Sequence, residues 1–160
     1  MKSAPRMALQ YVLLFGASGV TLPFAGLWFR AQGVSGAEIG ALLAIPMLGR
    51  VVTGPLLAVW ADGFQYRRTP IALLGLAMAL GYGGAGLVQG FAAWAVCWFV
   101  GATAAAALIP LSDVMTLRVA KRAGFDFSLP RGCGSAAFVV ANVGMGALLT
   151  RASPDAIIVW

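Results

Sequence analysis

Residues 39–61 read IGALLAIPMLGRVVTGPLLAVWA, an apolar run that contains a single charge, Arg50. A helix rises 1.5 Å per residue, so about 20 residues cross the roughly 30 Å hydrocarbon core of a bilayer, and this run is long enough. Backbone amides in lipid must be hydrogen-bonded within the segment, and the run lacks the alternation of a barrel strand. We therefore predict a transmembrane α-helix here.

The rest of the chain follows the same pattern. Of 160 residues, 61% are hydrophobic and 10% are charged, and the mean hydropathy is +0.89, well outside the range of soluble domains. The first run could be a signal peptide, but it continues past residues 17–19 without a polar cleavage region. The sequence predicts an all-α membrane protein with five complete transmembrane helices and the start of a sixth, at about residues 8–29, 39–61, 71–88, 91–117 and 131–150, with the sixth beginning at about 156.

Composition also excludes several classes of function. The net charge of +6 does not indicate a nucleic-acid partner, because apolar runs separate the basic residues. The chain has no His and only two Cys, both inside apolar segments, so we expect no metal site, no cofactor and no disulfide framework. We also expect no enzyme, since no nucleophile and base set is evident.

The basic residues predict the orientation. With the N-terminus in the cytoplasm, eight basic residues lie at the inner face and two lie outside, as the positive-inside rule requires. The inner group is Lys2, Arg6, Arg67, Arg68, Arg118, Lys121, Arg122 and Arg131, and the outer group is Arg30 and Arg151.

Arg50 lies eleven residues from each end of its run, near the predicted midplane of the bilayer. A charge there costs at least about 2.5 to 3.5 kcal/mol, so it should face a polar cavity or a partner. We interpret Arg50 as a solute-binding residue; a structural ion pair or a snorkelling side chain is the alternative.

Asp113 and Arg131 are predicted to meet. If the helices on either side of residue 122 form an antiparallel hairpin, residues equidistant from it share a depth, and these two are both nine residues away. The same arithmetic pairs Arg118 with Asp126. An Asp and Arg pair offers a solute both an acceptor and a planar fork of donors, whereas the alternative is a structural salt bridge.

A second group of charges follows the apolar run of residues 39–61. Asp62, Arg67 and Arg68 lie in the predicted inner loop, where an ion pair could open as helices rock. We interpret them as gating residues, and the alternative is a solvated loop. Glu38, after Ser35, matches the pattern of a helix cap.

Several of these motifs resemble one known family. The segments TLPF (21–24), EIG (38–40), AVWADGFQYRR (58–68), PLSD (110–113) and FDFSLPRGCGS (125–135) are similar to the N-terminal half of a major facilitator superfamily transporter. The resemblance is to the branch that contains the lactose permease, the 3-phenylpropionate transporter and the nucleoside–proton symporters. It covers nearly the whole chain, although Ala58, Gly63 and Gln65 depart from the loop signature and Cys133 replaces a frequent Trp.

The resemblance implies a single N-terminal transmembrane bundle over residues 1–160, with a C-terminal half absent. It implies solute-site roles for Asp113 and Arg131, a latch at Asp62 and proton symport. We expect a secondary active transporter of the cytoplasmic (inner) membrane that moves a small organic solute by alternating access. An aromatic carboxylate would suit Arg50 and Arg131.

Other interpretations stay open. A sugar or a nucleoside would suit the Asp113 and Arg131 pair. The chain could instead be a truncated, non-transporting membrane fragment, or a half-transporter that acts with a second copy.

Overall fold

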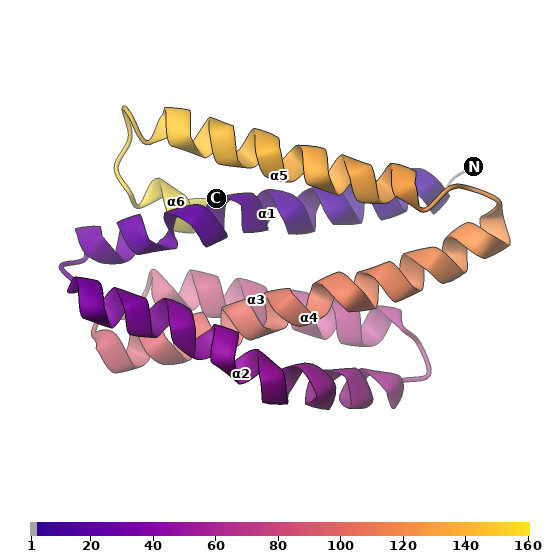
Figure 1. Ribbon diagram of the computed structural model, residues 1–160, viewed down its shortest axis with the longest axis horizontal. Coiled ribbons are helices and arrows are strands. Elements are labelled where there is room, and N and C mark those ends of the chain that lie inside the picture. Colours follow the sequence, from indigo (N-terminus) through magenta and orange to yellow (C-terminus); the bar gives the residue numbers. More distant parts are fainter. Residues whose placement is uncertain (1–2) are drawn as a thin grey trace. The chain divides into compact units, whose positions relative to one another are not determined.

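The computed structural model describes residues 3–160 and contains, within that range, six helices and no strand (Figure 1). The helices are α1 (Ser3–Ala31), α2 (Gly36–Asp62), α3 (Arg68–Ala85), α4 (Phe91–Ala123), α5 (Ser128–Leu148) and the short α6 (Ala156–Val159). The predicted all-α fold is confirmed. Lys2, one of the predicted inner charges, lies outside the described residues.

Three of these helices, α1, α2 and α4, are long and apolar enough to cross a membrane. Helix α3 is only 18 residues long and begins with Arg68, and α5 carries Arg131 in its first turns. Length and composition therefore support three crossings, and the count of five stays a prediction.

The helix ends follow local signals in the sequence. Ser35 caps α2 in a reciprocal pair with Glu38: its hydroxyl accepts from the Glu38 amide, and the Glu38 carboxylate accepts from the Ser35 amide at 3.0 Å. Gly124, with φ of +69°, follows the last residue of α4, where a left-handed residue is needed to leave a helix. Pro130 lies in the first turn of α5, where its missing amide hydrogen costs nothing.

The chain forms two compact groups of helices. The first contains residues 3–25, 112–158 and Trp160, so it includes the first part of α1, the end of α4 and all of α5. In this group α5 lies alongside α1 (Figure 1). A Cβ on Gly19 would lie 2.5 Å from the backbone oxygen of Phe138, and one on Gly134 would lie 2.9 Å from Cβ of Tyr11. These glycines let the two backbones approach closely.

The second group contains residues 26–111 and Val159. A Cβ on Gly81 of α3 would lie 2.4 Å from the backbone nitrogen of Gly101 of α4, so these helices also meet through glycine. Beside them, the buried rings of Phe29, Trp94 and Trp98 pack edge to face, with centroids 5.2 to 6.2 Å from the Phe29 ring. The core of this group is thus aromatic and apolar.

Candidate functional site

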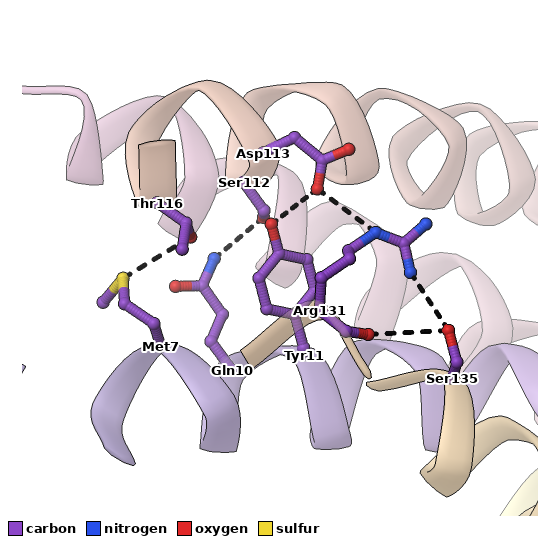
Figure 2. Close-up of polar contacts among 8 residues, drawn as sticks. All are labelled: Met7, Gln10, Tyr11, Ser112, Asp113, Thr116, Arg131 and Ser135. Atoms are coloured by element: carbon purple, nitrogen blue, oxygen red, sulfur yellow. Dashed lines mark hydrogen bonds and ion pairs between the residues drawn. The ribbon is translucent and has the colours of Figure 1, made fainter. Parts of the chain in front are cut away.

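Polar side chains of α1 and α4 meet in three successive contacts inside the first compact group (Figure 2). Each contact joins a residue near the start of α1 to one near the end of α4: Thr116 Oγ1 to Met7 Sδ at 3.6 Å, Gln10 Nε2 to Ser112 Oγ at 2.8 Å, and Tyr11 Oη to Asp113 Oδ1 at 2.5 Å. Met7 meets Thr116, whereas Gln10 and Tyr11, one turn later on α1, meet residues one turn earlier on α4, so the two segments are antiparallel. Ser112, Thr116 and Tyr11 are buried.

Arg131 of α5 completes this polar network. Its Nε lies 3.5 Å from Oδ1 of Asp113, the oxygen to which the Tyr11 hydroxyl also donates. The structure thus brings Asp113 and Arg131 together, as the hairpin geometry predicts. Each side chain is 31% exposed, so solvent screens this pair less than a surface ion pair but still reaches it.

The guanidinium of Arg131 also contacts two aromatic rings of α1. Its Cζ lies 4.3 Å from the centroid of the Phe15 ring and 5.7 Å from that of Tyr11, within the range of cation–π attraction. Its Nη1 lies 3.5 Å from Oγ of Ser135, one turn further along α5. Arg131 is therefore held by a carboxylate, two rings and a hydroxyl.

The predicted pairing of Arg118 with Asp126 is wrong, because no ion pair joins them within residues 3–160. Helix α4 ends at Ala123 and α5 begins at Ser128, so Asp126 lies in the connecting loop, where hairpin depth does not apply. Its carboxylate accepts from the backbone amide of Ser128 at 2.8 Å, and this hydrogen bond lowers the pKa of Asp126. Asp126 thus serves the start of α5.

Arg50 belongs to the second compact group and lies on α2 with an exposed side chain. No hydrogen bond or ion pair within the described part of the chain involves it. Arg50 therefore has no partner among residues 3–160 for the structural ion pair that was the alternative interpretation.

Of the three predicted gating residues, the structure joins two. Asp62, the last residue of α2, forms an ion pair with Nη1 of Arg67, and Arg68 begins α3 with an exposed side chain. The Asp62 side chain is 65% exposed, so this pair is open to solvent and adds little to stability by itself.

Five residues of this network were not predicted from the sequence as site residues: Gln10, Tyr11, Phe15, Ser112 and Thr116. The available signal was the presence of four hydrogen-bonding side chains inside apolar runs, which must find partners in lipid. Within residues 3–160 no group of three His, Cys, Asp or Glu residues is placed to hold a metal ion.

The model of the MFS_1 like family matches residues 5–159. The chain belongs to the MFS_1 like family. It is 29% identical over 145 residues to the maltose permease of Geobacillus stearothermophilus, a match that covers 86% of this chain and 35% of that protein. It is 26% identical over 151 residues to the probable 3-phenylpropionic acid transporter of Escherichia coli (strain K12), covering 94% of this chain and 40% of that protein.

These matches confirm the resemblance to a major facilitator superfamily transporter. The chain spans less than half the length of either relative, and no solved structure matches it. As a member of the MFS_1 like family with long apolar helices, it is a multi-pass membrane protein.

Proposed function

We propose that the protein is a secondary active transporter that moves a small organic solute together with protons by alternating access. In this proposal α1 to α5 span the cytoplasmic (inner) membrane, a sixth span begins near residue 156, and the N-terminus is cytoplasmic. A C-terminal half or a second copy completes the transporter. Family membership and the two relatives, one named a permease and one a transporter, support this proposal.

The contact between Asp113 and Arg131 is the observation that carries the proposal. Two opposite charges lie inside otherwise apolar helices, where each is costly, and both keep a third of their side-chain surface open. In the described part of the chain, the contacts of the carboxylate fall on Oδ1 alone. The second oxygen and part of the guanidinium of this pair are therefore left for a solute. Arg50, which belongs to the other group of helices, is proposed separately as a solute-binding residue because a charge inside an apolar helix is costly unless it faces a polar group.

An aromatic carboxylate is our first candidate solute. The planar fork of Arg131 suits a carboxylate, and the Phe15 ring 4.3 Å away offers an apolar surface for an aromatic group. The second relative is named for such an acid. A sugar or a nucleoside is the second candidate, because the open Asp113 oxygen accepts from hydroxyl groups and the first relative is named for maltose.

The ion pair of Asp62 with Arg67, together with Arg68, is proposed to gate the cytoplasmic side. A solvent-exposed pair is weak enough to break and re-form as helices move. Neutralising Asp62 should therefore change the transport rate more than the affinity for the solute.

Uptake into proteoliposomes tests the function. Two proteins are reconstituted separately: the product of the complete reading frame that encodes this chain, and residues 1–160 alone. Each is offered 3-phenylpropionate, maltose and a nucleoside, with and without an inward proton gradient. We expect gradient-dependent uptake of one solute by the complete product. Uptake by residues 1–160, with crosslinking of two copies, would identify a half-transporter. Absence of uptake of every solute by the complete product would contradict the proposal and favour a non-transporting membrane fragment.

A further inference from the structure

We propose that Tyr11 is a positioning residue of the solute site, whose hydroxyl occupies one oxygen of Asp113 and so keeps Arg131 from closing onto the carboxylate. This inference rests on the solute-binding role proposed for Asp113 and Arg131. The role follows from the meeting of the Tyr11 hydroxyl and Arg131 Nε at one oxygen, Oδ1 of Asp113 (Figure 2).

The phenol is the nearer of two competing donors. Tyr11 Oη lies 2.5 Å from Oδ1, at the short end of the range for hydroxyl donors to a carboxylate, whereas Arg131 Nε lies 3.5 Å from the same oxygen. A guanidinium that is free to pair with a carboxylate normally approaches to about 2.7–2.9 Å, often through two parallel hydrogen bonds. Oδ1 is thus hydrogen-bonded to Tyr11, and Arg131 is left at a distance.

Packing holds the Tyr11 hydroxyl beside Oδ1 of Asp113. The Tyr11 side chain is fully buried, and Gly134 of α5 meets its Cβ so closely that a methyl group there would lie 2.9 Å away. Its ring also packs against the edge of Phe127, with centroids 6.5 Å apart. Because Tyr11 is held in place by this packing, it keeps the Asp113 carboxylate in one orientation, which need not change when a solute binds.

Arg131 is meanwhile turned toward other groups. Its guanidinium lies over the Phe15 ring, with Cζ 4.3 Å from the ring centroid. Figure 2 shows that Nη1 points to Ser135 rather than to Asp113. The terminal nitrogens are therefore not paired with the carboxylate. Without the Tyr11 hydroxyl, Arg131 would close onto Asp113 in a two-point ion pair, and a solute would have to break that pair before binding.

Uptake kinetics of Tyr11→Phe test this role, because the variant keeps the ring and removes only the hydroxyl. For the solute that the wild-type protein takes up, we expect KM to rise about tenfold while the maximal rate stays within about twofold. The matched control is Tyr66→Phe, the same change on a side chain that is 68% exposed, with KM unchanged. An unchanged KM in Tyr11→Phe would overturn the proposal.

A double-mutant cycle separates positioning from packing. In the Asp113→Asn background the hydroxyl no longer shields a charged carboxylate from Arg131, so adding Tyr11→Phe should change KM by less than about twofold. If Tyr11→Phe has the same effect in both backgrounds, Tyr11 acts through packing and the proposal is wrong.

Infrared spectroscopy tests the proposal without any solute. The carboxylate band of Asp113, assigned from the difference between wild type and Asp113→Asn, should shift in Tyr11→Phe and stay in place in Tyr66→Phe. A band that does not move would overturn the role of Tyr11 whatever the transport results. Absence of uptake by wild type with a shifted band would instead contradict the proposed function alone.

Discussion

Arg131 and Arg50 are both arginines of apolar helices, but their surroundings differ. Arg131 has a carboxylate at 3.5 Å, an aromatic ring at 4.3 Å and a hydroxyl at 3.5 Å. Arg50 is exposed and makes no hydrogen bond or ion pair within residues 3–160. The insertion cost of a membrane arginine is thus offset by the chain's own groups at one position and not at the other. This difference is the reason that the proposed solute site is centred on Arg131 and its partners.

The largest expected effect concerns the close contact between α1 and α5, the helix that carries Arg131. Gly19→Ala would place a methyl group 2.5 Å from the backbone oxygen of Phe138, which cannot move aside easily. We expect the variant to lose about 2 kcal/mol of unfolding free energy in detergent–lipid bicelles.

The matched control lies on the helix of Arg50. Gly54 has no atom within 4 Å of its virtual Cβ, so Gly54→Ala should be neutral or stabilising by up to about 1 kcal/mol. Equal stabilities of the two variants would show that α1 and α5 do not meet as described.

The next effect is the loss of Arg131 itself. Arg131→Leu removes the ion pair and the cation–π contact and leaves the Asp113 carboxylate with the Tyr11 hydroxyl alone, so we expect a loss of about 1 to 2 kcal/mol. The value is moderate because both side chains are partly open to solvent. Chemical unfolding followed by tryptophan fluorescence measures it.

Arg50→Leu should have a smaller effect of opposite sign. The change removes no contact within residues 3–160 and removes the insertion cost, so stability should stay the same or rise by about 1 kcal/mol. A clear destabilisation would show that Arg50 has a partner of its own and would erase the contrast with Arg131.

The smallest expected effect concerns a third kind of charge, the loop carboxylate of Asp126. The hydrogen bond from the Ser128 amide lowers its pKa in the folded state below the unfolded value of about 3.9. The stability that this hydrogen bond adds to the folded state is therefore fully present above the unfolded pKa, and it is lost as the pH falls through the lower folded pKa. When the melting temperature is measured against pH, Asp126→Asn should slightly reduce its fall at acidic pH. Arg118→Gln should leave that fall unchanged.

The fold could be predicted from sequence because a lipid environment leaves few alternatives. Backbone groups in long apolar runs must form helices, and distance from residue 122 brought Asp113 and Arg131 to the same depth. The same arithmetic was wrong for Asp126, because this residue lies in the loop between α4 and α5, where its carboxylate accepts a hydrogen bond from the Ser128 amide.

Tyr11 was missed for a different reason. Which face of α1 meets α4 depends on helix rotation, and rotation is set by packing details such as the absent side chain of Gly134. An apolar run that is hydrophobic on every side carries little rotational signal.

The most direct test of the account is uptake by two neutralised variants of the complete reading frame, Asp113→Asn and Arg131→Gln. Each is compared with the same chemical change at an exposed position outside the network, Asp126→Asn and Arg118→Gln. We predict that the two network variants lose about 100-fold of wild-type uptake at low solute concentration, while the two controls retain it. Wild-type uptake by Asp113→Asn and Arg131→Gln would contradict the assignment of this network as the solute site.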